Sequence, residues 1–569
     1  MKEKGKSFLS EWSVELTGPM GTALQKTIEN RLKKINYTEL VDPFRYRSEA
    51  DDLWRCEFWG KIVRSVIRAW QGTHDPELYE IIQNTVEDLL STQTSDGCIS
   101  SYPESKQLSG WDLWGRKYVL TGLVRYCETF EDHDRALDAS CRMVEHLAKQ
   151  LGKFKLTDCG QHFGMAAASI LSPLVRLYRL SGNQAALALA DSIVENGACH
   201  LHNIYKAAAC GVPPAELSNG KSYEMTGCYE SLWEYAKVKP DPSYREILLR
   251  YYEMVRDKEI FITGTGGLKD GNGEFWFSGA ERQVWQKGMG KLGETCVTVA
   301  WLHYCRSILE MTDDSRVADE MERSFYNGLL GAMHPDGHGW IHRNPTPLSA
   351  PSSKKITGEQ IPGYGGHDCC LAQGPEGISM ISEYSFAAVP GGIRVNGYEN
   401  SCLRFQTPSG NSARLVLTGD YPAEGKIRIS LELESAEQFV LELRVPGWSE
   451  QTTLCINGAE EYLSAGSYAV LERVWEPGTV LELSLDMQIR QVSVPGYPEY
   501  TAFCRGPLVL AQDSRYTEVG VPAAGPFEWK RCQTDAIYSC ESGGMVLCDY
   551  ASAGNGFSPE NTLQVWLNV

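Results

Sequence analysis

The chain has 569 residues and a formal net charge of −19 at pH 7. Such an acidic surface repels nucleic acids and anionic membranes, so we expect neither as a partner. No apolar run approaches the length of a membrane span, and the opening residues lack the apolar core of a secretion signal. We therefore expect a cytoplasmic protein whose eighteen cysteines are free thiols or metal ligands rather than disulfides.

The first two-thirds of the sequence has the pattern of amphipathic helices. Apolar residues recur at every fourth position in one early run, Trp54, Phe58, Ile62, Val66 and Trp70. Short polar breaks between helical runs recur roughly every fifty to seventy-five residues, which is typical of repeated helical hairpins. We predict about ten to twelve helices between residues 20 and 383, as an (α/α)6 barrel or a helical solenoid. Long glycine- and aromatic-rich loops over 199–222 and 260–293 favour the barrel, because they suit the mouth of a closed ring.

The sequence pattern changes near residue 384. The segments RLVLTGDYP, KIRISLELES and FVLELRVPGW alternate apolar and polar residues with a period of two, as β-strands do. A further strand-like segment, YTAFCRGPLVLA, follows residue 496. We therefore predict a barrel over 1–383, a β-sandwich over 384–495, and a second β segment or partial sandwich over 496–569.

Two adjacent cysteines, Cys369 and Cys370, are the most unusual local feature of the chain. Adjacent cysteines do not easily bond to each other, because disulfide geometry is demanding. They could be two buried thiols, halves of two different disulfides, or two ligands of one metal, in which case a tetrahedral zinc ion would need two more ligands. Candidate partners are the neighbouring His367 and Asp368, or Glu294 and Cys296 in the distant segment GETC.

Several segments resemble the β-L-arabinofuranosidase family, glycoside hydrolase family 127. These segments are GETCVTVAWL, DEMERSFYNGLLGAM, HRNPTPLS, CCLAQGPEGISMI, RVPGWS and RGPLVLA, and they occur in the order seen in that family. The resemblance runs from about residue 50 to 515 and implies an (α/α)6 barrel followed by β-sandwiches. It also implies a zinc ion held by Glu294, Cys296, Cys369 and Cys370.

The same resemblance implies the catalytic residues of a retaining glycosidase. Cys369 matches the nucleophile of the family, and Glu274 in GNGEFW matches the acid/base, with Glu281 in SGAERQ as its competitor. A metal-bound thiol is deprotonated, which would supply the thiolate. As a general acid Glu274 needs a raised pKa, and we expect its aromatic neighbours over 275–277 to provide it.

The substrate is expected to be a glycoside, with an L-arabinofuranoside as the default sugar. Residues expected to bind it are Trp111, Tyr118, Tyr223, Glu224, Trp276 and His367. The family has a cysteine at the position of His367 and a histidine at the position of Tyr118, so the reaction type transfers more safely than the sugar. A homodimer is compatible with the sequence, which leaves the oligomeric state open.

Two other functions agree with the same pattern. One is a polysaccharide lyase on the same toroid, in which tyrosine and histidine abstract a proton and zinc is structural. The other is a non-catalytic glycan-binding protein with a structural zinc. A structural zinc site also has four protein ligands, so the number of ligands does not separate these alternatives.

Overall fold

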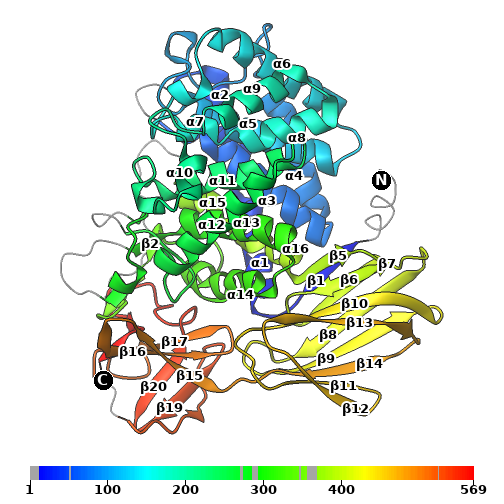
Figure 1. Cartoon of the computed structure of the whole chain (residues 1–569), viewed down its shortest axis with the longest axis vertical. Coiled ribbons are helices and arrows are strands. Elements are labelled where there is room, and N and C mark those ends of the chain that lie inside the picture. Colours follow the sequence, from blue (N-terminus) through cyan, green and yellow to red (C-terminus); the bar gives the residue numbers. More distant parts are fainter. Residues whose placement is uncertain are drawn as a thin grey trace.

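The computed structural model describes residues 12–49, 53–268, 273–284, 292–344, 348–354, 368–522 and 525–568. Helices form one large domain, and two β units lie against one end of it (Figure 1). Within these described ranges, no helix combines the length and the apolar character needed to cross a bilayer.

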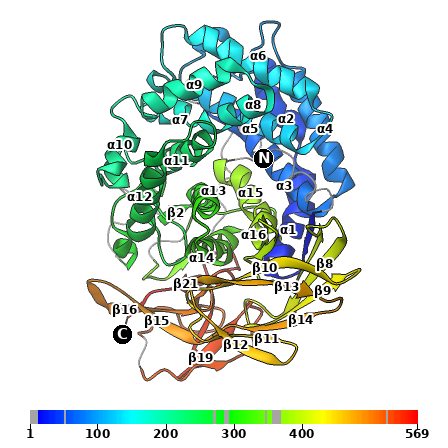
Figure 2. The same cartoon turned by 45° about the vertical axis from the view of Figure 1, so that its right-hand side comes forward.

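Six helices form a closed inner ring. They are α3 (Phe58–Thr73), α5 (Asp112–Thr129), α8 (Leu171–Ser181), α11 (Ser222–Ala236), α13 (Thr295–Thr312) and α15 (Cys369–Ser379). Each packs against the next, and α15 packs against α3 to close the ring, which is visible in Figure 2. These helices are buried on several sides because neighbours and outer helices cover them.

An outer helix covers each member of the inner ring. The outer helices are α4 (Pro76–Leu90), α6 (Asp134–Leu151), α9 (Gln184–Glu195), α12 (Pro242–Lys258), α14 (Ser315–Arg323) and α1 (Pro19–Asn30). This double ring confirms the predicted (α/α)6 barrel. The remaining α-helices are α2 (Tyr37–Tyr46), α7 (Met165–Ala168), α10 (Ile204–Ala209) and α16 (Ile381–Ser385), so the described residues contain more helices than predicted.

Inner helices α3 and α5 approach each other closely at a glycine. A Cβ atom on Gly60 would lie 2.0 Å from the carbonyl oxygen of Tyr118, which is far inside van der Waals contact. The two helices therefore pack backbone to backbone at this point. Their positions matter for the site, because α3 carries Lys61 and α5 begins directly after Trp111.

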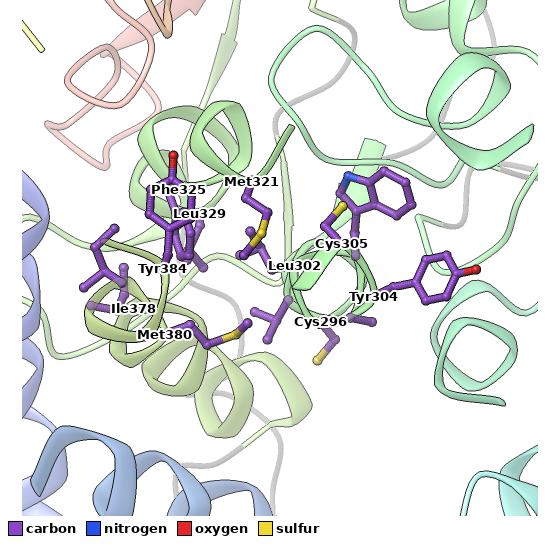
Figure 3. Packing of buried hydrophobic residues seen from close by; sticks show 14 of the residues in the cluster. Cys296, Leu302, Tyr304, Cys305, Met321, Phe325, Leu329, Ile378, Met380 and Tyr384 are labelled. Carbon is purple, nitrogen blue, oxygen red and sulfur yellow. The ribbon is translucent and has the colours of Figure 1, made fainter. Parts of the chain in front are cut away.

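Helices α13 and α15 share one hydrophobic core. Figure 3 shows Leu302 and Cys305 of α13 packed near Met321 of α14, with Ile378 of α15 and Met380 alongside. All five side chains are buried. This packing fixes the relative position of the two helices whose first turns carry the cysteines of the GETC and CCLAQGPEG segments.

The first β unit is a sandwich of two sheets. A seven-stranded sheet has the order β1-β7-β8-β9-β14-β11-β12, and a four-stranded sheet has the order β13-β10-β6-β5. Strands β8 and β9 alternate buried and exposed residues, as the sequence pattern predicts. The strands are β1 (Ser13–Leu16), β5 (Phe386–Val389), β6 (Gly392–Val395), β7 (Ser401–Gln406), β8 (Ser412–Gly419), β9 (Lys426–Leu433), β10 (Glu437–Val445), β11 (Thr452–Ile456), β12 (Ala459–Leu463), β13 (Ser467–Trp475) and β14 (Val480–Ser484).

The N-terminal strand β1 belongs to this sandwich rather than to the barrel. It pairs antiparallel with β7, with Ser13 opposite Arg404. Glu399, just before β7, accepts hydrogen bonds from the backbone N–H of Met20 (2.8 Å) and Gly21 (3.2 Å) at the start of α1. Burial raises the pKa of Glu399 to about 7. The sandwich thus holds the first helix of the chain.

The second β unit is one sheet with nine strands. Its main order is β15-β16-β17-β20-β19-β18, and β21, β22 and β4 pair at its side. The strands are β15 (Ile489–Val494), β16 (Tyr497–Arg505), β17 (Leu508–Asp513), β18 (Lys530–Arg531), β19 (Ser539–Ser542), β20 (Met545–Asp549), β21 (Thr562–Gln564), β22 (Leu567–Asn568) and β4 (Ser352–Ser353). A separate pair, β2 (Leu292–Glu294) and β3 (Arg343–Asn344), lies in the barrel domain.

This sheet packs against residues 261–268 and 273–284 of the barrel domain. The two share a hydrophobic cluster that includes Phe261, Val284 and Trp566. Gln283 links them, because its Oε1 accepts hydrogen bonds from the backbone N–H of Ile262 (3.0 Å) and from Nε1 of Trp566 (3.1 Å). The second β unit therefore supports the barrel loop that contains residue 274.

Candidate active site

The N-termini of two inner helices converge on one point. Glu294 is the N-cap residue of α13, and Cys296 is in its first turn. Cys369 and Cys370 are the first two residues of α15, whose N-cap Asp368 accepts a hydrogen bond from the backbone N–H of Leu371 (2.6 Å). Free N–H groups and the helix dipole at both N-termini favour negative charge, so this position suits thiolates and carboxylates.

A short β-pair brings a histidine to the same point. Glu294 in β2 lies opposite Arg343 in β3, which places His342 next to Glu294. The backbone N–H of Thr295 donates to the carbonyl oxygen of His342 (3.1 Å), and Sγ of Cys370 lies 3.6 Å from that same oxygen. The β-pair thus links the start of α13 to the segment containing His342.

Five donor atoms gather where these elements meet. Sγ of Cys369 lies 3.2 Å from Oε1 of Glu294 and 3.9 Å from Sγ of Cys370. Sγ of Cys370 lies 3.5 Å from Oε1 of Glu294 and 3.5 Å from Sγ of Cys296. Nε2 of His342 lies 3.4 Å from Oε1 of Glu294 and 3.8 Å from Sγ of Cys369.

These separations suit a zinc ion. Ligands on a tetrahedral zinc, at bond lengths of 2.0–2.3 Å, lie about 3.3–3.8 Å from one another. The donors in the cluster are separated by nearly those distances, and thiolate, imidazole and carboxylate are the usual zinc ligands. The residues present therefore fit the metal that the sequence analysis predicted.

The cluster concentrates negative charge in a buried place. Hydrogen bonds from Cys296 and Cys370 lower the pKa of Cys369 well below its ordinary value, and nearby His342 lowers it further. Burial raises the pKa values of Cys296 and Cys370. Burial, with the neighbouring charges of Glu274 and Cys369, raises the pKa of Glu294 to about 8. The geometry thus selects Cys369 as the thiol that ionises first.

Glu274 lies beside this cluster and is paired with a lysine. Its carboxylate contacts Nζ of Lys221, and its Oε1 lies 3.7 Å from Nε2 of His342. Its backbone oxygen accepts hydrogen bonds from the N–H (2.9 Å) and hydroxyl (2.6 Å) of Ser222, which fixes the residue against α11. Burial alone would raise the pKa of Glu274, but His342 and Lys221 together hold it well below its ordinary value. The expected raised pKa is therefore wrong for this arrangement of side chains, because His342 and Lys221 together outweigh the effect of burial on the pKa of Glu274.

A cavity of about 370 Å³ opens onto these residues. Its lining residues are Trp54, Glu57, Lys61, Trp111, Trp114, Gln161, His162, Lys221, Tyr223, Glu224, Glu274, Glu294, Cys296, His342, Asp368 and Cys369. Cys369 is partly exposed to it, whereas Cys296 and Cys370 are buried. Indole rings with a few charged groups are what a sugar-binding pocket requires, because flat apolar faces stack on sugar rings and polar groups bind hydroxyls.

The predicted substrate-binding residues divide into two groups. Trp111, Tyr223 and Glu224 line the cavity, and the Trp111 ring meets those of Trp114 and His162 edge to face. Tyr118 lies behind the lining, with its hydroxyl 2.5 Å from that of Tyr223.

Trp276 is fully buried, and its Nε1 donates to the hydroxyl of Tyr251 (3.1 Å), away from the cavity. Glu281 is not among the described lining residues, whereas Glu274 is. His367 lies outside the described residues.

Several residues of the site were not predicted from the sequence. His342 lies in the segment HRNPTPLS, and only the pairing of β2 with β3 brings it to Glu294. Lys221 precedes the predicted Tyr223, but nothing in the sequence indicated its pairing with Glu274. Glu57, the N-cap residue of α3, and Lys61, one turn further along, form a buried ion pair (3.0 Å) at the cavity wall.

Residues 16–383 match the family model described as the β-L-arabinofuranosidase GH127 catalytic domain, and residues 392–487 match the GH127 middle domain. The chain belongs to the GH127 β-L-arabinofuranosidase family. It is therefore a glycoside hydrolase by family, and the resemblance seen in its sequence motifs is confirmed.

Known members of GH127 are similar to the chain over most of its length. A non-reducing end β-L-arabinofuranosidase of Bifidobacterium longum is 22% identical over 491 residues, covering 77% of this chain and 72% of that protein. The crystal structure of a GH127 β-L-arabinofuranosidase from Geobacillus stearothermophilus T6 matches with a TM-score of 0.76 at 19% identity, over 98% of this chain and 99% of that one. A second GH127 β-arabinofuranosidase structure has a TM-score of 0.78 at 18% identity, over 98% and 96% of the two chains. The structural matches show a common fold.

Proposed function

We propose that this GH127 member is a retaining glycosidase with a cysteine nucleophile, acting on L-arabinofuranosides or related glycosides. Cys369 is the nucleophile and Glu274 the acid/base, while Glu294, Cys296, Cys369 and Cys370 hold a zinc ion. The observation that carries this proposal is the position of Cys369. It is the member of the thiol cluster with the lowered pKa and with exposure to the cavity.

In the first step, Sγ of Cys369 attacks the anomeric carbon while Glu274 gives a proton to the departing glycosidic oxygen. A carbon–sulfur bond forms and the carbon–oxygen bond breaks. In the second step, Glu274 takes a proton from water, which attacks the same carbon and releases the thiolate. Two displacements at one carbon give net retention. Bound zinc would keep Cys369 deprotonated and oriented.

Lys221 keeps Glu274 in the form that the second step needs, since its charge favours the carboxylate. The first step needs the protonated carboxyl group. We expect a bound sugar to raise the pKa of Glu274 by displacing water from its surroundings in the aromatic cavity. Lys221 and a bound sugar would therefore shift the pKa of Glu274 in opposite directions.

The size of the cavity limits the sugar that it binds. Ligand pockets range from about 300 to 1,000 Å³, so a cavity of about 370 Å³ suits a small glycone rather than a long polysaccharide segment. The substrate that fits best is therefore a glycoside from which one terminal sugar is released.

The test is hydrolysis of a panel of aryl glycosides by the wild type and the variants Cys369→Ser and Glu274→Gln, after zinc content is measured. We expect Cys369→Ser to abolish turnover and Glu274→Gln to lower it by about 10²–10⁴-fold. Because a good leaving group needs no proton, the loss in Glu274→Gln should be smallest for nitrophenyl glycosides. Undiminished hydrolysis by a folded Cys369→Ser variant that retains zinc contradicts the proposed nucleophile.

The same assay separates the other two functions. A polysaccharide lyase would release an unsaturated sugar that absorbs ultraviolet light. A glycan-binding protein would show affinity for a glycan of the panel without turning any of them over.

A further inference from the structure

The thiol cluster offers five metal donors where a tetrahedral ion needs four. Two sets of four donors are possible, and both include Glu294, Cys369 and Cys370. Cys296 completes the first set, in which its Sγ lies 3.5 Å from that of Cys370. His342 completes a second set, because its donor atom and those of the three shared residues all lie within 4.8 Å of one another.

The orientation of His342 is fixed by a buried carboxylate. Its Nδ1 lies 3.2 Å from Oδ2 of Asp368. Asp368 is itself held in place, since its other oxygen caps α15 through the N–H of Leu371. A histidine whose Nδ1–H donates to a carboxylate presents the lone pair of Nε2, which is the usual arrangement around a metal-bound imidazole. Here Nε2 faces Glu294 and Cys369.

We propose that His342 is a fifth donor of the zinc site and that its Nε2 holds the ion while Cys369 is not bound to it. This inference rests on the proposed function, because it requires the zinc ion and a cysteine that leaves it. When Cys369 forms its bond to sugar carbon, its electron pair passes into the carbon–sulfur bond. The neutral imidazole of His342 would then take the place of this thiolate as a ligand through the lone pair of Nε2.

A fifth donor would allow Cys369 to serve as both ligand and nucleophile. A thiolate that shares its electrons with a metal attacks less readily, so Cys369 has to loosen that bond to react. Without a replacement, the ion would retain only Glu294, Cys296 and Cys370. With His342 the number of protein ligands stays at four throughout, which is the number that zinc sites of closed geometry hold.

The experiment compares zinc binding by Cys369→Ala, by the double variant Cys369→Ala with His342→Gln, and by wild type. The dissociation constant is measured by competition with a chromophoric chelator, and the ligands by X-ray absorption at the zinc edge. We expect Cys369→Ala to hold one zinc per chain with an imidazole ligand. We expect the double variant to lose that ligand and to bind zinc at least about 10-fold more weakly, since even an outer-shell partner of a metal ligand contributes 10–100-fold.

His162→Gln in the Cys369→Ala background is the matched control. His162 lines the same cavity, but its Nε2 faces Glu224 (3.8 Å), so its loss should leave zinc affinity unchanged. If the double variant binds zinc as tightly as Cys369→Ala, or if Cys369→Ala shows no imidazole at the zinc, the proposal is wrong. If wild type binds no zinc, the zinc site and the role of His342 both fail together.

A second measurement serves if Cys369→Ala does not fold. Wild type is alkylated with iodoacetamide, which can reach Cys369 because that thiol is partly exposed to the cavity, and modification of Cys369 is checked by mass spectrometry. Retention of zinc with an imidazole ligand supports the proposal. If alkylated wild type loses as much zinc as alkylated His342→Gln does, the proposal is wrong.

Discussion

The balance of charge in the site determines which of its side chains are ionised. Cys369, Glu294 and Glu274 place three acidic groups around one point, and Lys221 and His342 are the cations beside them. Burial disfavours a charged His342, yet the surrounding thiol and carboxylates raise its pKa far above its ordinary value. The acidic groups of the site therefore favour a bound cation. The zinc ion proposed above would balance this negative charge more fully than a proton, because it would contact several of these donors at once.

Glu399 offers a pH test of a single buried group. Its pKa of about 7 exceeds the ordinary value of about 4.3, so the stability it contributes is complete below pH 4.3 and is lost as the pH rises through 7. Glu399→Gln keeps an acceptor for the N–H groups of α1 but cannot ionise. We expect the melting temperature of the variant, relative to wild type, to rise between pH 5 and pH 8. The corresponding free energy is on the order of 3 kcal/mol.

A thermal melt of both proteins across this pH range provides the measurement. Glu437→Gln is a control, because Glu437 is a carboxylate of the same sandwich whose pKa is lowered instead by bonds from Asn411, Thr407 and Ser409. Its relative melting temperature should fall slightly or stay level over the same range. A flat difference for Glu399→Gln would show that the carboxyl group is ionised throughout.

The sequence indicates some site residues better than others for physical reasons. Glu294, Cys296, Cys369 and Cys370 all precede or begin inner-ring helices, and the starts of these two helices meet at the cavity. Trp276 is different. It follows a turn at Glu274, so no strand periodicity predicts the direction of its side chain: its Nε1 donates to Tyr251 in the core, while the Lys221 ammonium lies over the ring of Phe275.

At the level of elements, the contact between α3 and α5 sets the width of the barrel beside the cavity. Gly60→Ala would place a methyl group 2.0 Å from the carbonyl oxygen of Tyr118. Since this oxygen belongs to the backbone, the helices have to separate. We expect a loss of stability of about 1–3 kcal/mol, the usual cost of overpacking, or more. Thermal or chemical denaturation measures it, and activity should fall because Lys61 and Trp114 move.

Gly227→Ala is the matched control for this prediction. Gly227 is in the middle of another inner helix, α11, but a Cβ atom there would meet its nearest neighbour at 3.7 Å, an ordinary contact. The alanine should be neutral or stabilise the helix by up to about 1 kcal/mol, since glycine is a poor helix former. Equal effects of the two substitutions would rule out close packing as the cause.

Sequence periodicity predicts the helices and the long strands, but it does not predict the short strands. The alternation in RLVLTG and KIRISLEL predicts β8 and β9 because each spans several repeats of the pattern. Strand β1 has four residues and β4 has two, too few for a period to appear. Both depend on partners far along the chain, β7 and β21, which no local pattern specifies.

At the level of the whole molecule, the second β unit stabilises the loop that carries Glu274. Trp566→Ala would remove the ring that donates to Gln283 and fills the shared hydrophobic cluster, at a local cost of about 3–5 kcal/mol. We expect a clear loss of kcat with zinc content unchanged, because the four proposed zinc ligands lie at the starts of α13 and α15 instead. Steady-state kinetics and metal analysis on the same sample test this.

Trp529→Ala is the comparison within the same β unit. Its ring stacks on Phe527 and meets Phe503, rather than residues 261–268 and 273–284 of the barrel domain. It should lower thermal stability while kcat stays near that of wild type. If Trp566→Ala also leaves kcat unchanged, the second β unit does not act through the loop.

The pairing of β1 with β7 has a consequence for biosynthesis. Ribosomes add about 5–20 residues per second, so roughly 20–80 s separate the synthesis of Ser13 from that of Arg404. During this interval the first strand has no partner, and α1 lacks its cap from Glu399. The ring is open for nearly as long, since α3 must wait for α15. A nascent chain thus exposes apolar helix faces until the segment with Cys369 emerges, and chaperones are needed most before that moment.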